Sequence, residues 1–463
     1  MAGIEVLAQE LLLEIMFMLP DNIGQKFAIA QISRLWRDVA LDSHLFWSSF
    51  TGDSKADYRR LPLMLERSGS STMINIQFRF RYSDFVAWRT DASTVLIPYV
   101  PRIETLDMTF SVPVDATALL GSGMEFPVLR TLHLDPGIGP TLLFTAPQLR
   151  ALDIDAIGLR DWVTLLSPSL ESVRLWGGTL EMLVAVLELC PRVSRIAVKT
   201  SELSYGNETE ARFEALSRPF APALRELELD VFEDTDLVRV LKTGFSDVVL
   251  HTLKGRICNG HGEENVALLA GTLLLGVGPL VDFKLVDLMQ DVELQDEAGH
   301  VRHLQCWNSY FEVREVWKHL SLHYDLHKTV REIRIHAEHW HDYVEVFESY
   351  PPQLEDGITL AIDTSQGKFP QIWDDEGHFQ QASKILQMPG LFKVKFCGAN
   401  DSDYFLQTIS DVLALVEPPA GRKVEVCVEL ETGVQSALTT LRSTLLENSS
   451  SWAICSHCVR CVQ

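Results

Sequence analysis

The chain has 463 residues, 46% of them apolar, and a formal net charge of −23. This length accommodates two or three domains, or one small domain followed by an extended repeat array, and the apolar content excludes wholesale disorder. The acidic surface repels phosphate backbones and anionic lipids, which excludes nucleic acids and membrane surfaces as favourable partners.

The beginning of the sequence carries Glu5, Glu10 and Glu14 among its apolar residues and has no basic leader. This pattern argues against a secretory signal peptide. The eight cysteines are scattered through a large chain and do not resemble a disulfide framework. We therefore expect reduced thiols and a cytoplasmic or nuclear location, or both.

Residues 7–19 predict an amphipathic helix with two adjacent apolar stripes. The first stripe recurs every four residues, at Leu7, Leu11, Ile15 and Leu19, and the second comprises Ala8, Leu12 and Met16. A helix that packs only against its own domain needs one stripe. We therefore expect one face of this helix to contact the domain and the other to contact a partner.

Two further apolar segments follow the first helix. Helical spacing from Ala28 to Val39, through Ile29, Ile32, Leu35 and Trp36, predicts a second helix, and Leu45 to Phe50 forms a third short cluster. Three short helices in about 45 residues bury too little surface to be robustly stable alone. A partner protein or the following domain is expected to cover the remaining apolar surface.

This N-terminal segment resembles an F-box. Residues 7–15, together with Leu19-Pro20, are similar to the opening of that motif. Residues 32–40 are similar to its second signature, and Leu45-Phe46-Trp47 to its end. Two positions depart from the usual pattern, because Ala8 replaces a proline and Met16 replaces a phenylalanine.

The resemblance implies a three-helix F-box domain, residues 1–50, that binds a Skp-type adaptor and through it a cullin–RING ligase. By motif position, the adaptor-facing or interface-supporting residues are expected to be Leu7, Leu11, Ile15, Leu19, Ile32 and Trp36. The alternative is that these six are ordinary core residues of a small helical domain. Residues 61–78 also resemble the segment that follows the F-box in many fungal members. This resemblance implies a helix, a Gly/Ser turn and an alternating strand, so residues 51–99 are predicted to supply a connecting helix and first strand.

A proline-led pattern then recurs, with aliphatic residues at the second, fifth and seventh positions after the proline. It begins at Pro101, Pro127, Pro147, Pro168, Pro191, Pro222 and Pro389, and Val330-Ile333-Ile335 matches without the proline. The first six copies start 26, 20, 21, 23 and 31 residues apart, and leucine-rich repeats run about 20–29 residues. The last two aliphatic residues of each copy would lie on one face of a short strand.

No single copy can close its own core, so the copies must stack. The pattern predicts an irregular leucine-rich-repeat-like α/β solenoid over residues 100–400, irregular because the asparagine usual after the strand is absent. A string of unrelated amphipathic strands in a mixed fold is the alternative, and it weighs more for residues 233–400. The apolar run 266–281 predicts a buried helix that turns into a strand, because 16 residues are too few for a membrane span.

Residues 401–463 are predicted to form a closing unit and tail. A helix over 404–416, a strand over 424–430 and a helix over 434–446 are expected to shield the last repeat, followed by a flexible stretch at 448–451. The tail also carries Cys455, Cys458 and Cys461, which we expect to be adventitious thiols rather than a metal or redox site.

Six of the 14 histidines lie between residues 319 and 341. His319, His323 and His327 share a helix face, and His336, His339 and His341 follow a strand. Such spacing can bind zinc, but no HExxH motif is present, so we expect solvated or hydrogen-bonded histidines and no metal. No phosphate loop, nucleophile elbow or dinucleotide fingerprint occurs, so neither a catalytic residue nor a cofactor is predicted.

The predicted fold class is α/β, an N-terminal three-helix F-box followed by an irregular leucine-rich-repeat-like solenoid. The predicted function is that of a non-catalytic substrate-recognition subunit of a Skp–cullin–F-box ubiquitin ligase, with an unidentified protein as the target. One alternative is a non-catalytic repeat scaffold with a degenerate F-box. The other is a metal-binding enzyme that uses the cluster from His319 to His341.

Overall fold

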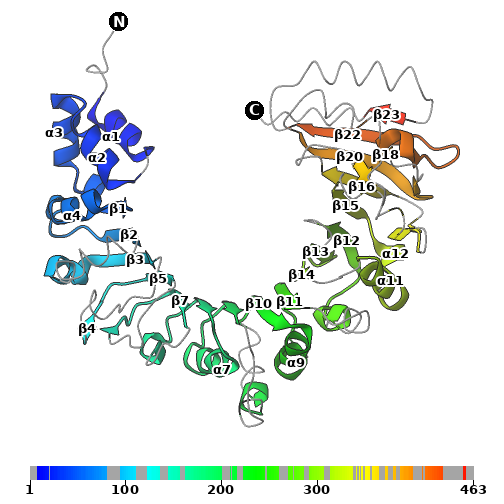
Figure 1. The fold of residues 1–463 in the computed structure, drawn as a ribbon, viewed down its shortest axis with the longest axis horizontal. Helices are drawn as coiled ribbons and strands as arrows, with labels where there is room; N and C mark the ends of the chain where they lie inside the picture. The colour runs from blue at the N-terminus through cyan, green and yellow to red at the C-terminus, as the bar shows by residue number, and fades with distance from the viewer. Residues whose placement is uncertain are drawn as a thin grey trace, which may run out of the picture. The chain divides into compact units, whose positions relative to one another are not determined.

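The structure is a computed structural model, and it divides into two compact units, Met1–Leu224 (unit 1) and Arg225–Gln463 (unit 2). It describes residues 8–19, 21–80, 94–110, 123–135, 144–156, 162–200, 209, 211–215, 223–245, 248–259, 269–274, 276–285, 291–306, 313–336, 340, 344, 346–347, 350–354, 357–363, 371–373, 379–381, 386–399, 409, 412–430 and 452–454. Both units combine helices with mostly parallel strands (Figure 1), which confirms the predicted α/β class.

Unit 1 begins with α1 (Gln9–Phe17), α2 (Ile23–Ile29), α3 (Arg34–Asp42) and the short 3-10 helix η2 (His44–Trp47). The prediction of one continuous helix from Ala28 to Val39 is wrong, because the chain turns between α2 and α3. Two side-chain caps set these boundaries: Asn22 accepts a hydrogen bond from the backbone N–H of Gln25, and Ser33 accepts one from that of Trp36.

Strand β1 (Ser49–Gly52), helix α4 (Lys55–Arg67) and strand β2 (Ile74–Phe80) follow. The helix, turn and strand predicted within residues 61–78 are confirmed. Gly69 makes the turn with a φ of +73°, a conformation that favours glycine. The last apolar cluster of the predicted F-box is only partly helical, because its final residues enter β1 instead.

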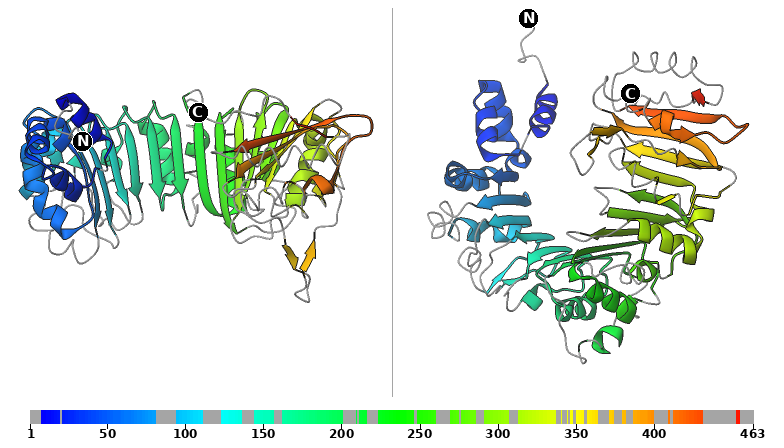
Figure 2. Two further views of the ribbon diagram at one scale, coloured as in Figure 1. Left: turned by 90° about the horizontal axis from the view of Figure 1, so that it is seen from above. Right: turned by 45° about the vertical axis from the view of Figure 1, so that its right-hand side comes forward.

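Parallel strands lie side by side in unit 1. Seven strands pair in chain order, each with the next (Figure 2): β1, β2, β3 (Ile103–Phe110), β5 (Thr131–Asp135), β7 (Ala151–Asp155), β8 (Ser172–Trp176) and β9 (Arg195–Lys199). Equivalent residues of the copies align directly, as Leu106, Leu132, Leu152, Val173 and Ile196. The prediction that Leu132, Leu152 and Val173 lie on neighbouring parallel strands is confirmed.

The aligned aliphatic side chains form the core of unit 1. All five are at most 2% exposed, and each fully buried side chain of this size contributes about 1.5–3 kcal/mol. Helix α7 (Leu180–Leu189), with Leu183 and Leu187 buried, lies on one face of the strands. The connections also contain η3 (Ile97–Arg102), η4 (Trp162–Leu165) and the short parallel pair β4 (Met124–Glu125) and β6 (Phe144–Thr145).

Unit 2 departs from the predicted succession of one parallel strand per repeat. The first elements still agree with that succession: strand β10 (Glu226–Glu233), helix α9 (Asp234–Phe245) and strand β11 (Thr252–Asn259), with β10 and β11 parallel. The chain then forms an antiparallel meander of β12 (Leu280–Leu285), β13 (Asp291–Asp296) and β14 (Val301–Cys306). β14 lies beside β11, while β12 pairs with β15 (Glu332–His336).

The rest of unit 2 returns to parallel pairing. Helices α11 (Val313–Tyr324) and α12 (Leu326–Thr329) precede β15 in the chain. Five strands then pair in order, each with the next: β15, β16 (Ile358–Asp363), β20 (Leu391–Ala399), β22 (Val424–Leu430) and β23 (Trp452–Ile454). Two small additions are the antiparallel hairpin of β17 (Gln371–Trp373) and β18 (Phe379–Gln381) and the parallel pair β19 (Leu386–Gln387) and β21 (Val416–Glu417).

The C-terminal predictions have mixed outcomes. The strand over 424–430 is confirmed as β22, and residues 412–415 are helical as expected. The helix predicted over 434–446 and the tail at 448–451 lie outside the described residues. The run 266–281 contains helical residues at 269–273 and enters β12 at its end, as predicted for the part that is described.

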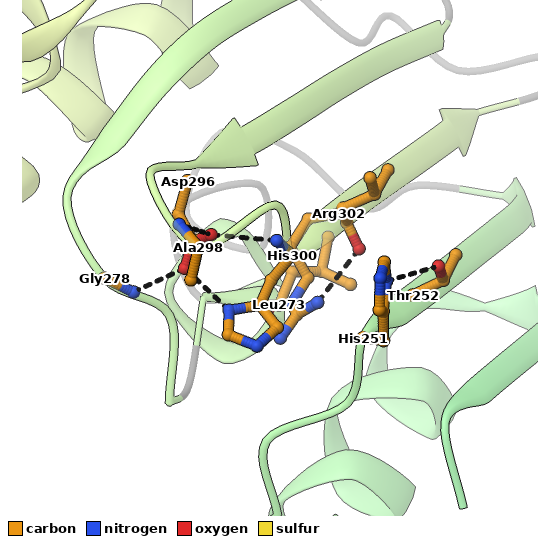
Figure 3. Close-up of polar contacts among 9 residues, drawn as sticks. His251, Thr252, Leu273, Gly278, Asp296, Ala298, His300 and Arg302 are labelled. Atoms are coloured by element: carbon orange, nitrogen blue, oxygen red, sulfur yellow. Dashed lines mark hydrogen bonds and ion pairs between the residues drawn. The ribbon is translucent and has the colours of Figure 1, made fainter.

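A buried carboxylate organises the turn between β13 and β14 (Figure 3). The Asp296 side chain is 1% exposed and accepts hydrogen bonds from the backbone N–H groups of Gly278, Ala298 and His300, at 2.8–2.9 Å, and from His300 Nδ1 at 2.8 Å. Burial alone would raise the pKa of Asp296, but these bonds from His300 and Gly278 hold it at about 2. Nearby, buried Arg302 donates from Nε to the Leu273 carbonyl at 2.8 Å.

Candidate functional site

The two apolar stripes of α1 have different surroundings. Leu12 and Met16 are 0% and 2% exposed, whereas Leu11 is 47% exposed and Ile15 37%. Leu12 and Met16 pack inward, because α1 lies against α3 and η2. Leu11 and Ile15 face away from the domain, as expected if one face of the helix is reserved for a partner.

The six residues that the F-box resemblance singles out do not share one environment. Leu19 and Ile32 are exposed, at 38% and 59%, like Leu11 and Ile15. Trp36 is only 4% exposed, so it belongs to the core of the helical domain and does not face outward. Leu7 lies outside the described residues.

Apolar exposure is concentrated in this part of the chain. Of the 17 exposed large apolar side chains among the described residues, eight lie between residues 11 and 45. Besides the four above, they are Phe17, Met18, Leu41 and Leu45, of which Met18 is 85% exposed. Isolated exposed apolar residues are ordinary, whereas this stretch carries eight of them within 35 residues. We call these eight residues the apolar face.

A buried lysine lies within the same helical part of unit 1. Lys26 of α2 is 2% exposed, and its Nζ donates to the Phe46 carbonyl at 2.6 Å and to the Ser49 carbonyl. The Asp21 carboxylate lies 2.9 Å from the same Nζ. Burial lowers the pKa of Lys26, and the hydrogen bond that Lys26 donates to Asp21 opposes that shift. Lys26 therefore ties α2 to η2 and to the start of β1.

Aromatic stacking joins the same helices to α4. Trp47 donates from Nε1 to the Ala40 carbonyl at 2.6 Å, and its ring centroid lies 5.5 Å from that of Phe27. The Arg67 guanidinium lies over both rings, 4.6 Å from the Trp47 centroid and 5.1 Å from that of Phe27. These contacts fix the helices that carry the apolar face.

Strand β1 connects the helical part to the sheet of unit 1. Ser49 to Gly52 pair in parallel with residues 75–78 of β2, and the Phe50 and Phe78 rings are 6.1 Å apart. Gly52 lies so close to Phe78 that a Cβ there would approach its ring within 2.9 Å. The apolar face and the parallel strands are thus parts of one compact unit.

A row of polar side chains crosses the strands of unit 1 on the face opposite the aliphatic core. Asp107, His133, Asp153 and Arg174 are aligned on β3, β5, β7 and β8. His133 Nδ1 lies 3.1 Å from Asp153 Oδ2, and Asp153 also accepts from Trp176 Nε1 at 2.8 Å. Each member occupies the polar position between two aliphatic residues of a repeat copy. That position is visible in the sequence, but the row was not predicted from it.

The charges in this polar row shift one another's protonation. The hydrogen bond with Asp153 raises the pKa of His133, against the opposing effect of burial. Burial would raise the pKa of Asp153, but His133 and Trp176 bind its charged form and lower it. Burial and the neighbouring aspartates raise the pKa of Asp135, although His133 opposes them. Three members of the row are 22–28% exposed, and Arg174 is 51% exposed.

The strands of unit 2 also carry a polar face. A shallow hollow there is lined by residues of β12, β13 and β15, namely Asp282, Phe283, Lys284, Glu293, Gln295, Glu332 and Arg334. Lys284 lies 3.5 Å from Glu293, and Arg334 3.1 Å from Glu332. Burial and the neighbouring Glu332 raise the pKa of Asp282. Most charges in this hollow are therefore matched within the protein.

The predicted metal and thiol candidates are only partly described. His319 and His323 are neighbours on α11, but the prediction that His327 shares their helix face is wrong, because Asp325 adopts a left-handed conformation after α11 ends and His327 lies in the separate helix α12. His336 is buried on β15. His339, His341 and the three tail cysteines lie outside the described residues. Among the side chains that are described, no three or more His, Cys, Asp or Glu gather as a metal site.

The chain matches no protein-family model and no curated protein. Within the described ranges, every helix is too short or too polar to cross a lipid bilayer.

Proposed function

We propose that the chain is the substrate-recognition subunit of a Skp–cullin–F-box ubiquitin ligase. In this proposal the apolar face docks the Skp-type adaptor, and the repeat body holds a target protein. The observation that carries the proposal is the exposure of Leu11, Ile15, Leu19 and Ile32, which occupy F-box motif positions. Catalysis belongs to other subunits of the complex.

The apolar face is large enough to matter energetically. Fully burying a leucine or isoleucine side chain contributes about 1.5–3 kcal/mol, and the four motif residues are 37–59% exposed. Covering the exposed part of each would therefore contribute about 1 kcal/mol per residue. Association also carries an entropic cost, so the remaining members of the apolar face would be needed for tight binding.

For the body, we propose an irregular leucine-rich-repeat-like solenoid. Support comes from the one-to-one alignment of the copies in unit 1 and from their spacing of 20–31 residues. The polar row of unit 1 is the proposed target-binding surface, since its half-buried charges can give specificity through hydrogen bonds. Within the described residues no helix covers that face of the strands (Figure 1).

Pull-down of a purified Skp-type adaptor tests the proposal with a matched pair of charge substitutions. Ile15→Arg places a charge in the apolar face, while Leu189→Arg places the same charge on α7, at an equally exposed leucine. Ile15→Arg should abolish adaptor binding and Leu189→Arg should leave it unchanged. If the wild-type chain does not bind, or if Ile15→Arg binds within about twofold of wild type, the adaptor proposal is wrong and the scaffold alternative takes its place.

A further inference from the structure

Helix α11 of unit 2 buries one side and leaves two histidines on another. Val316, Trp317 and Leu320 are at most 1% exposed, and the Trp317 ring lies 5.0 Å from that of Phe283 on β12. His319 is half-buried and His323 exposed. The packing that fixes the helix therefore also fixes the position of both imidazoles near the surface.

The two imidazoles face each other. They are four residues apart, so they lie one turn apart on the same helix face, and their ring centroids are 4.5 Å apart. Neither ring has a hydrogen bond or ion pair to any other described residue. The rings contact each other, and the His319 ring centroid also lies 6.3 Å from that of Tyr324.

Other described histidines of the chain are used differently. His133, His300 and His303 each lie beside an aspartate, and His44 contacts the Arg67 carbonyl. Those imidazoles have a structural partner that the protein itself supplies. His319 and His323 instead keep their ring nitrogens available to an external ligand.

Gly271 approaches this pair from a neighbouring segment. Gly271 has no side chain, and a Cβ built there would lie 3.9 Å from His319 Nε2 and 3.4 Å from the Tyr324 hydroxyl. That hydroxyl donates to the Gly271 carbonyl at 3.3 Å, which holds the two segments together. Both histidines also lie in the second half of α11, where the carbonyl end of the helix dipole favours a cation.

We propose that His319 and His323 form a chelating site for a divalent transition-metal ion of the zinc, nickel and copper class. Imidazole nitrogen suits these ions, and two histidines spaced i, i+4 on a helix can bind one ion together. The protein supplies two ligands, so water or a partner's side chain would complete the coordination. The net charge of −23 favours the approach of the cation. This site is separate from the apolar face and from the polar row.

Isothermal titration of the full-length chain with NiCl2 at neutral pH tests the site. His319→Gln and His323→Gln should each weaken the binding step of Ni²⁺ at this site at least tenfold. The matched control is His251→Gln, which removes another exposed imidazole of unit 2. It should leave that step unchanged. Titration with ZnCl2 should show the same order of the three variants.

A second measurement localises the ion in the wild-type chain and does not depend on how a variant folds. Diethyl pyrocarbonate modifies accessible imidazoles, and mass spectrometry reports each modified peptide. Saturating Ni²⁺ should protect His319 and His323 and leave His251 reactive. Equal modification of His319 and His323 with and without the ion would overturn the proposal, as would Ni²⁺ affinities of both variants within twofold of wild type.

Discussion

Trp36 and Ile32 separate folding from docking in the N-terminal helices. They are four residues apart in the sequence, but Trp36 is 4% exposed and Ile32 59%. Truncating a buried tryptophan to alanine costs about 3–5 kcal/mol. Surface substitutions usually change stability by less than about 0.5 kcal/mol. Trp36→Ala should therefore destabilise the helical part, and Ile32→Ala should not.

A third variant tests the environment of the Trp36 indole. Its Nε1 is buried and has no hydrogen-bond partner among the described residues. Leaving a donor unsatisfied in this way costs about 1–3 kcal/mol. Trp36→Phe removes that donor and keeps an aromatic ring, so it should cost less stability than Trp36→Ala.

Hydrogen exchange and adaptor affinity together measure these effects. Trp36→Ala should lower protection across residues 8–52, and Trp36→Phe should lower it less. Ile32→Ala should keep wild-type protection but weaken adaptor binding about tenfold, equivalent to about 1.4 kcal/mol. Wild-type protection in Trp36→Ala would refute the buried position of this residue. Loss of protection in Ile32→Ala as large as in Trp36→Ala would assign Ile32 to the core.

Two further predictions concern unit 2. The fold lowers the pKa of Asp296 from the ordinary 3.8 to about 2, and this shift stabilises the folded state by about 2 kcal/mol. That stabilisation is fully present above pH 3.8 and is lost as the pH falls towards 2. Denaturant titrations of Asp296→Asn should lack this acid-labile component, and an unchanged pH profile would contradict the assignment. Gly390→Ala should destabilise unit 2 by more than about 2 kcal/mol, because its Cβ would lie 1.7 Å from the Leu354 carbonyl oxygen. The control Gly278→Ala meets only an ordinary contact at 3.4 Å, and equal melting temperatures for the two variants would rule out the clash.

The spacing of aliphatic residues alone was enough to predict the parallel strands of unit 1. The last two aliphatic residues of each copy are two apart, which is the spacing of side chains on one face of a strand. Similar copies bury one another's apolar side chains only when their strands pair in register. Leu132, Leu152 and Val173 accordingly align without any shift. The same reasoning separated the two stripes of α1, because a helix of period 3.6 cannot turn Leu11 and Leu12 to the same side.

Other features depended on contacts that a local pattern does not contain. The break between α2 and α3 depends on the Ser33 cap, which competes with an apolar spacing that is also compatible with one continuous helix. Trp36 could be assigned to the core only once α1 and η2 were packed against α3. The meander of β12 to β14 reverses the strand order, and nothing in the apolar spacing distinguishes a parallel from an antiparallel neighbour.

The polar residues show the same division. His133 and Asp153 each lie between two aliphatic residues, so their side chains point to the face of the strand opposite the core. Only the register of β5 against β7 brings them within 3.1 Å of each other and raises the pKa of the imidazole. Likewise, helical spacing put His319 and His323 on one face of α11, but the close approach of Gly271 to His319 and Tyr324 arises from packing between segments distant in sequence. Periodicity is a local property of the chain, whereas pairing, burial and charge coupling depend on which segments become neighbours.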